Sequence, residues 1–460
     1  MKRIILICTV ALLASCGIYK PYSRPDEVKT NDLYGADYEA ADTTSLADLE
    51  WQEIFTDPLL QELIDTALKQ NSDLNSAQWR VAEAEAALKS ARLAILPSFN
   101  FAPNGGVSSF DGSKGAWSYT LPLSASWQID IFGGINNAKR RAKAAYAQSK
   151  EYRQAVRTQL IAGVANLYYT LLMLDGQFLA TARTAESLQE SAETMAAMME
   201  AGMANRASVA QIEAAAFSTK TTLYDLEYSI REVENSLCLL LGEIPHTIKR
   251  STLAEQQIPD HISAGIPLEA LSMRPDVRMA EHSLEQAFYA TASARSALYP
   301  TLTLEGVLGW TNSAGSVVVN PGGVILSAAG SLVAPIFNAG GLRAQLKIAK
   351  AQQEEALIAF QQSLLNAGSE VNNALMKVQT TLAKRELRSE QIKALEAAYE
   401  STQLLMKHGS TTYLEVLTAE QNLLSGRIAS ITDKLEELQA MISLYNSLGG
   451  GREVECEEVK

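Results

Sequence analysis

Alternation of apolar and polar residues marks two stretches of the chain as strands. From Trp117 to Ile131 every second residue is apolar, and the residues between are small or polar. Residues 301–311 show a similar pattern, with leucines and a tryptophan set among threonines. A period of two predicts a strand with one apolar and one polar face. Further segments around Phe99 and over residues 324–337 complete the prediction of two strands within 98–131 and two within 300–337.

A different spacing, of three and four residues between apolar positions, predicts very long helices over residues 136–200 and 342–407. Shorter helices with the same spacing are predicted over 206–241 and 412–447. Such sustained spacing is typical of coiled coils, in which one stripe is buried against a neighbour. At about 1.5 Å per residue the long helices reach roughly 100 Å, so we expect them to project as rods.

Each strand pair is preceded by a further helix. The first runs from about residue 57 to 96 and is expected to end at Pro97, and its counterpart begins after Asp276 and ends before Pro300. Proline has no amide hydrogen and clashes with the preceding helical turn, so it stops a helix.

The chain is an internal duplication. Asp73 and Pro97 recur as Asp276 and Pro300 at an offset of 203 residues, and the Gly202 region recurs at Gly409 at an offset of 207. An ordered series at a nearly constant offset indicates two copies of one module. We therefore divide the chain into a first repeat and a second repeat, with other segments at the start, between them and at the end: 57–242, 273–448, 16–56, 243–272 and 449–460.

The first residues determine the compartment. Residues 1–15 have a basic start, Lys2 and Arg3, and then an apolar run too short to span a bilayer, which predicts a secretory signal peptide. The segment ends in Leu-Ala-Ser-Cys, which matches the lipobox of bacterial lipoproteins, in which Cys16 is acylated. The alternative is a signal peptide that contains a cysteine by chance. Loss of the signal would change the formal net charge from −13 to −15.

Composition narrows the function classes. The 460 residues are 47% hydrophobic and 20% charged, with 52 acidic against 39 basic side chains. An acidic excess argues against a nucleic-acid partner, because such proteins need clustered basic residues. No run of about 18 apolar residues follows the first 15, which excludes an ordinary helical membrane protein. Length alone predicts two to four separate domains.

Motifs for catalysis are missing from the sequence. It contains no phosphate-binding loop, no Gly-x-Ser-x-Gly elbow and no His-Glu-x-x-His pair, and its four histidines are scattered. We therefore expect no enzyme activity, no metal site and no cofactor. Cys238 stands among leucines, where a buried free thiol is the favoured interpretation.

Alternation alone also fits a strand of an ordinary sandwich. Three observations favour membrane strands: aromatic residues on the apolar faces, a length of about 10 to 15 residues, and the predicted lipid anchor. The predicted membrane-facing aromatics are Trp117, Tyr119, Trp127 and Trp310. Four strands leave two open edges, which lipid does not tolerate, so the sheet must close into a barrel. Three copies would supply twelve strands and a cylinder of twelve helices.

Taken in order, the motifs resemble those of the TolC-like outer membrane factors, in the lipoprotein branch that serves resistance-nodulation-division (RND) efflux. The resemblance rests on the lipobox, the two proline helix ends, the Phe-Gly and Phe-Asn-Ala-Gly-Gly junctions after the strands, and the helix turn at 409–417. It implies a mainly α fold with a transmembrane β-barrel portion: a homotrimer with a 12-stranded β-barrel in outer membrane lipid, continued by a 12-helix periplasmic α-barrel and an equatorial belt. It also implies a passive duct for an inner-membrane RND transporter, joined by a periplasmic adaptor.

The resemblance further suggests where the duct narrows. Family members constrict at residues just after the turn glycine, which here are Leu414, Glu415, Leu417 and Thr418. Thr418 departs from the family, which commonly has a second aspartate there, so a double acidic ring is in doubt. The alternative for Glu415 is a solvated side chain on the outer face. By analogy, the turns at Gly202 and Gly409 are the adaptor contacts.

Two other functions remain open at the level of sequence. The chain could be a non-conducting periplasmic coiled-coil scaffold, or the outer membrane component of type I protein secretion. The lipobox favours efflux, because secretion-linked members of the family more often lack one.

Overall fold

The computed structural model describes residues 20–25, 50–109, 111–112, 114–256, 274–314 and 317–451. The predicted signal peptide, Cys16 and much of the segments 16–56, 243–272 and 449–460 lie outside the described residues. Contacts divide the described chain into two compact units. The first contains residues 79–151 and 278–363, and the second contains 50–78, 152–256 and 364–451.

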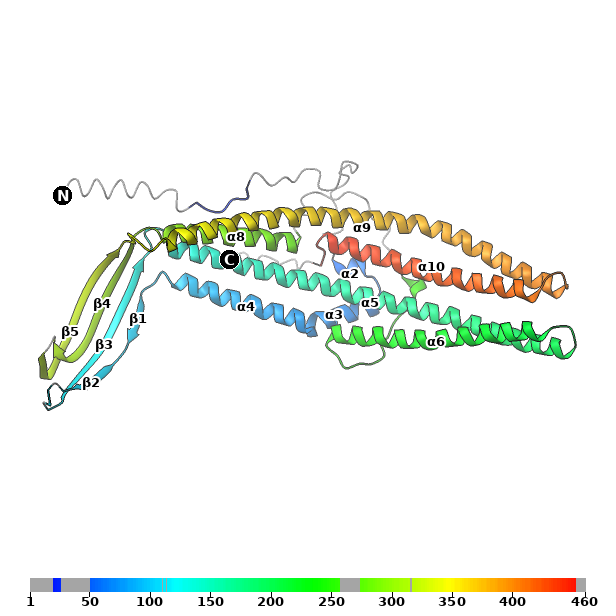
Figure 1. The fold of residues 1–460 in the computed structure, drawn as a ribbon, viewed down its shortest axis with the longest axis horizontal. Helices are drawn as coiled ribbons and strands as arrows, with labels where there is room; N and C mark the ends of the chain where they lie inside the picture. The colour runs from blue at the N-terminus through cyan, green and yellow to red at the C-terminus, as the bar shows by residue number, and fades with distance from the viewer. Residues whose placement is uncertain are drawn as a thin grey trace. The chain divides into compact units, whose positions relative to one another are not determined.

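Helices and strands follow the order of the predicted modules (Figure 1). The first module comprises α2 (Trp51–Ile54), α3 (Pro58–Gln70), α4 (Ser72–Leu93), β1 (Ser98–Phe101), β2 (Asn104–Ser108), β3 (Ala116–Ile129), α5 (Gly134–Glu200) and α6 (Arg206–Leu241). After the short η3 (Leu253–Glu255), the second module comprises α8 (Pro275–Ser296), β4 (Thr301–Ala314), β5 (Val317–Val333), α9 (Gly341–Lys407) and α10 (Tyr413–Ser447).

Element lengths repeat between the two modules. Helices α4 and α8 each have 22 residues, and α5 and α9 each have 67. The first residues of α4 and α8, and those of α5 and α9, are separated by the same offsets that the sequence motifs show. The two modules therefore have the same architecture.

One prediction about the first helix is wrong. The expected helix over 57–96 is broken at Asn71, between α3 and α4. The Asn71 side-chain oxygen accepts hydrogen bonds from the amides of Asp73 and Leu74, at 2.9 and 3.0 Å, so this residue caps α4. Its side-chain nitrogen donates to the carbonyl of Leu240 in α6, at 2.9 Å, which fixes the break against a neighbouring helix.

The prediction of two strands within 98–131 is also wrong, because the structure has three. Strands β1 and β2 both pair antiparallel with β3, at Ser98–Phe101 against residues 126–123 and at Asn104–Ser108 against 120–116. Pro103 stands between them and has no amide hydrogen to donate to the ladder, which interrupts what would be one strand. Strand order is β1-β3-β4-β5, with β2 also on β3, so β1 with β2 and β5 form the two ends of the sheet.

The main core lies in the second unit. Tyr168, Leu171 and Leu172 of α5, Leu60 and Ile64 of α3, Leu237 of α6 and Tyr445 of α10 are all almost completely buried there. Cys238 belongs to this cluster as a buried free thiol, which confirms the interpretation from sequence. Burial of this stripe on each helix is the reason the three-four spacing is sustained. Within the described residues, no helix has an apolar stretch long enough to cross a membrane.

Candidate channel-forming surfaces

The five-stranded sheet exposes its apolar face. Along β3, Trp117, Tyr119, Leu121 and Leu123 are exposed, while the small or polar residues between them are half-buried. Trp117 is the most exposed of these, at 74%. A sheet in a water-soluble protein turns its apolar side chains inward, so this sheet has the opposite polarity.

Pairing extends this apolar face across the sheet. Leu123 lies opposite Phe101 of β1 and Leu308 of β4, and Leu308 lies opposite Leu326 of β5. All four side chains are exposed. Residues directly opposite each other in a ladder project to the same face, so these side chains form one continuous apolar row.

The predicted aromatic residues lie on this apolar face with satisfied polar atoms. The indole nitrogen of Trp310 donates to the hydroxyl of Tyr119 at 3.2 Å, and that of Trp127 donates to the carbonyl of Ile95 at 2.8 Å. Their rings remain about 40% exposed. An exposed aromatic ring with a hydrogen-bonded polar end is suited to the boundary between lipid and water.

The other face of the sheet is polar and internally bonded. The hydroxyls of Thr120 and Thr311 are 3.1 Å apart, and the Asn312 side-chain nitrogen donates to the carbonyl of Trp117 at 2.9 Å. Thr311 and Asn312 are buried. Sequence alternation predicted this two-faced character, but not which face would be exposed.

The predicted gate residues lie at the first turn of α10, and the structure separates them. Leu414, Glu415 and Thr418 are exposed. The Thr411 hydroxyl donates a short hydrogen bond to the Glu415 carboxylate, and the Thr418 hydroxyl donates to the carbonyl of Leu414 at 2.8 Å.

Leu417 differs from the other three gate residues, because it is only 7% exposed. It packs in a cluster with Leu188 of α5 and with Val209 and Ile212 of α6. In this structure Leu417 therefore joins α10 to its own chain, and its assignment to the constriction is wrong. Residue 417 lies about 300° around the helix from residue 414, on the same side as the buried Val416.

The turns at Gly202 and Gly409 have the same backbone geometry. Both glycines are left-handed, with φ of 75° and 70°. The amide of Gly202 donates to the carbonyl of Met199, and that of Met203 to Met198, at 3.0 and 2.8 Å. Gly409 makes the equivalent pair of bonds, so each long helix ends in a Schellman motif.

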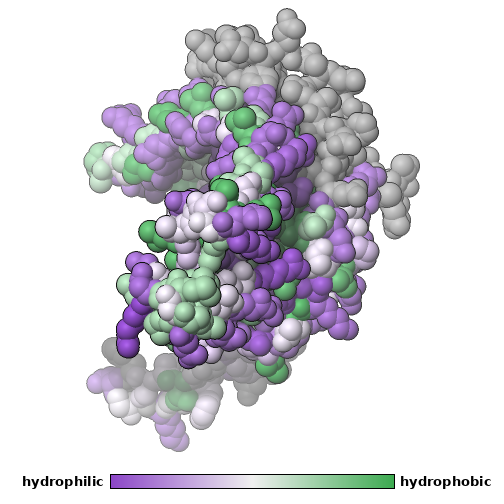
Figure 2. Space-filling view, turned by 90° about the vertical axis from the view of Figure 1, so that its right-hand side faces the viewer, coloured by the Kyte–Doolittle hydropathy of each residue, from purple (hydrophilic) through white to green (hydrophobic). Residues whose placement is uncertain are grey.

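Residues beside both turns pack in one cluster. Met199 and Ala204 next to the first turn, and Met406 and Tyr413 next to the second, contact the buried cluster that contains Leu417. The two turns thus lie at a common end of the second unit, as Figure 1 also shows. Seen from that end, hydrophilic residues are interspersed with smaller hydrophobic ones (Figure 2).

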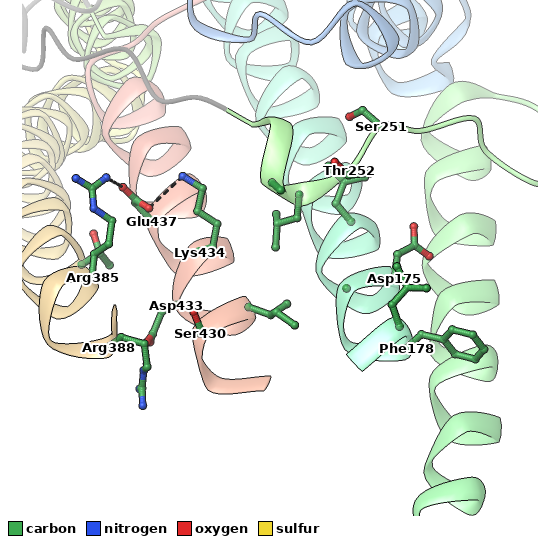
Figure 3. Close-up of a pocket in the computed structure, with 17 residues that line it drawn as sticks. Asp175, Phe178, Ser251, Thr252, Arg385, Arg388, Ser430, Asp433, Lys434 and Glu437 are labelled. Atoms are coloured by element: carbon green, nitrogen blue, oxygen red, sulfur yellow. Dashed lines mark hydrogen bonds and ion pairs between the residues drawn. The ribbon is translucent and has the colours of Figure 1, made fainter. Parts of the chain in front are cut away.

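A groove of about 700 Å³ lies in the second unit between α5, α9, α10 and the segment that carries η3. Figure 3 shows Arg385, Arg388, Asp433 and Glu437 on the α9 and α10 side and Asp175 of α5 on the other. Arg385 pairs with Glu437 at 3.1 Å and Arg388 with Asp433 at 2.6 Å. The groove charges therefore neutralise one another and serve to join the helices.

Two buried polar networks have no signal in the sequence. Arg250 pairs with Glu234 of α6 at 2.6 Å and with Asp175 of α5, and so fixes the segment after α6. Nearby, the Asp57 carboxylate accepts hydrogen bonds from Ser251, Tyr168 and Gln256. Most of these partners are far apart in the chain, so local spacing could not reveal them.

Burial and hydrogen bonding act in opposite directions on Asp57. Burial favours the neutral acid, but the hydrogen bonds from Ser251, Tyr168 and Gln256 and from the amide of Leu59 outweigh it. They hold the pKa of the Asp57 carboxyl below its usual value. The carboxylate therefore stays charged and anchors the start of α3 to α5.

Comparison with known proteins places this architecture. The family model described as "Outer membrane efflux protein" matches the chain twice, over residues 63–243 and 266–450. The toluene efflux pump outer membrane protein TtgC of Pseudomonas putida is 28% identical over 465 residues, with 97% of this chain and 95% of that protein covered. The pyoverdine export outer membrane protein OpmQ of Pseudomonas aeruginosa is 30% identical over 475 residues, with 98% and 97% covered.

Solved structures agree with the sequence relatives. The open state of the Neisseria gonorrhoeae MtrE outer membrane channel superposes with a TM-score of 0.83 and 28% identity, over 94% of this chain and 98% of that one. A crystal structure of CusC superposes with a TM-score of 0.85 and 26% identity, over 94% and 99%. The chain therefore belongs to the outer membrane efflux protein family, whose members are the outer membrane channels of tripartite efflux systems.

Proposed function

We propose that three copies of this outer membrane channel join their sheets into one 12-stranded β-barrel, continued into the periplasm by a barrel of twelve helices. The observation that carries the proposal is the exposed apolar face of the sheet. Strands β3 and β4 have 14 residues each and β5 has 17, longer than the roughly 9–11 that a tilted strand needs to cross a bilayer.

The sheet edges support closure by other copies. The sheet ends at β1 with β2 on one side and at β5 on the other. In lipid, each unpaired amide and carbonyl at an edge costs several kcal/mol, so an edge must find a partner. Strands β1 and β2 lie in line on β3 and count as one position, so each copy supplies four positions and three copies supply twelve.

The proposed activity is passive conduction of small molecules. An inner-membrane RND pump would expel them through a periplasmic adaptor that contacts the turns at Gly202 and Gly409. The relatives are named for efflux of toluene and export of pyoverdine, which supports efflux of small molecules over protein secretion. Acylation of Cys16 would add a lipid anchor in the outer membrane.

A test of the function uses a host that lacks its own outer membrane channel. Expression of this chain with an RND pump and its adaptor is expected to restore resistance to a pump substrate. Purified protein is expected to form a heat-labile oligomer that conducts ions in a planar bilayer. An oligomer without conductance, or a chain that stays in the soluble periplasm, would contradict the proposal.

We propose that Glu415, with Leu414 and Thr418, narrows the periplasmic entrance. Three copies of an exposed carboxylate at one level would form an anionic ring that favours cations. Replacing Glu415 by alanine is then expected to lower cation preference and raise conductance. Glu193→Ala is the matched control, because Glu193 is an exposed carboxylate on α5 near the other turn. Identical single-channel records for Glu415→Ala and wild type would exclude the ring.

A further inference from the structure

Four helices of the second unit form a row with two different ends. Arg388 of α9 pairs with Asp433 of α10 at 2.6 Å, Gln177 of α5 donates to Thr432 of α10 at 3.2 Å, and Lys220 of α6 donates to Gln189 of α5 at 3.0 Å. These contacts give the order α9-α10-α5-α6, which Figure 1 shows. Helices α9 and α6 are the two ends of the row.

Each end helix carries large apolar side chains that are more than half exposed. On α6 these are Phe217, Tyr224, Tyr228 and Leu239, and on α9 they are Leu365, Met376 and Leu387. In both helices three of them recur at every eleventh position, at 217, 228 and 239 and at 365, 376 and 387. Eleven residues make almost three full turns, so each set forms a nearly straight stripe along its helix.

The two stripes can be compared by height, because both helix turns lie at one end of the unit. At about 1.5 Å per residue, Tyr228 lies roughly 33 Å along α6 from Arg206, the first residue of that helix. Leu387 lies roughly 30 Å along α9 from Lys407, the last residue of that helix. Measured from the same two helix ends, Leu239 and Met376 lie at roughly 50 and 47 Å.

Charge at these heights is complementary as well. Residues 213–234 of α6 contain five acidic and two basic side chains, and residues 377–396 of α9 contain five basic and three acidic ones. The opposing segments therefore have net charges of −3 and +2. Opposite net charge favours the approach of α6 to α9 and disfavours two α6 helices side by side.

From these observations we infer that the α6 stripe of one copy packs against the α9 stripe of the next, with Tyr228 level with Leu387 and Leu239 level with Met376. The two surfaces differ, so the contact is head-to-tail and closes into a ring when the rotation between copies allows it. This inference rests on the trimer proposed above and assigns the residues that join its helices.

Paired cysteines test the assignment in purified, full-length trimer. The matched pairs are Tyr228→Cys with Leu387→Cys, and Leu239→Cys with Met376→Cys, in a background with Cys238 and Cys456 changed to alanine. A short bis-maleimide is expected to give covalent dimers and trimers on a denaturing gel, because packed helices lie about 8–10 Å apart. Single-cysteine variants are expected to remain monomeric on that gel.

Mismatched pairs are the control for height. Tyr228→Cys with Met376→Cys places the two sulfurs about 14 Å apart along the helix axes and is expected to cross-link at least tenfold less. Equal cross-linking of matched and mismatched pairs would overturn the inferred register. Cross-linking by Tyr228→Cys alone would indicate a two-fold contact between α6 helices and would also overturn it.

The outcome can be separated from that of the proposed function. If the matched pairs give no product while the heat-labile trimer and efflux persist, the α6–α9 interface is wrong and the channel stands. If wild type forms no trimer, both proposals fall. Rapid labelling of Tyr228→Cys by a bulky maleimide in the assembled trimer would likewise refute the interface, because a packed side chain excludes the reagent.

Discussion

Leu123 and Ser124 are neighbours near the middle of β3 whose side chains lie on opposite faces of the sheet. Leu123 is 44% exposed in the apolar row, while Ser124 is half-buried on the polar face and its hydroxyl donates to the carbonyl of Asn100 at 3.2 Å. A charge introduced at these two positions therefore asks which face meets lipid. We expect Leu123→Arg to prevent stable insertion and Ser124→Arg to be tolerated.

The expected magnitudes differ clearly. An arginine on the lipid face near the middle of a membrane barrel costs about 2–4 kcal/mol, so three copies would cost about 6–12 kcal/mol per trimer. Ser124→Arg loses one hydrogen bond, which costs about 1 kcal/mol per copy, while its charge would face water inside the barrel. The difference is large compared with the error of an unfolding measurement.

Two assays measure this difference. Urea titration of protein refolded into lipid vesicles gives the free energy of unfolding, and fractionation of cells gives the amount of heat-labile oligomer in the outer membrane. Leu123→Arg should lower both, and Ser124→Arg should stay close to wild type. If Ser124→Arg is as damaging as Leu123→Arg, or more so, the exposed apolar face does not meet lipid and the orientation proposed for the sheet is wrong.

Three further predictions concern the second unit. The pKa of Asp57 is held low in the folded chain, so its contribution to stability is present above about pH 4 and is lost as pH falls further; Asp57→Asn should weaken that acid dependence in thermal unfolding followed by circular dichroism. Arg250→Ala leaves the buried Glu234 without its inner partner and should cost about 3–5 kcal/mol, whereas Arg231→Ala, which removes an exposed partner of the same carboxylate, should cost less than about 1 kcal/mol in denaturant unfolding. Gly409→Ala forces a left-handed φ on a residue with a Cβ and should destabilise by about 1–2 kcal/mol, while Gly409→Asn should cost less; equal melting temperatures for the two variants would contradict the strain argument.

Periodicity found the elements but not their interruptions. The long helices α5 and α9 closely match the predicted ranges 136–200 and 342–407, because a sustained apolar stripe at three-four spacing is specific to a helix. The break at Asn71 could not be predicted in this way, since the residues on both sides suit a helix and the cap depends on a contact with Leu240 of α6. The gap between β1 and β2 has a local signal in Pro103, which alternation alone does not register.

The candidate site shows the same division. Glu415 and Leu414 could be placed at a helix start from the turn glycine and the resemblance to a family. The burial of Leu417 could not, because the side chains that cover it come from α5 and α6, which belong to the other repeat of the chain. The partners of Arg250 were equally invisible, because an ion pair depends on which helices become neighbours.

The sequence by itself determined the duplication, the lengths of the helices, the two-faced strands and the family resemblance, because each of these is written in local spacing. The tertiary structure alone decided which face of the sheet is exposed, which residues fill the core and which helices stand at the ends of the row. The physical reason is that burial is a property of neighbours: a period of two shows that a strand has two different faces, and only packing shows which of them is left uncovered.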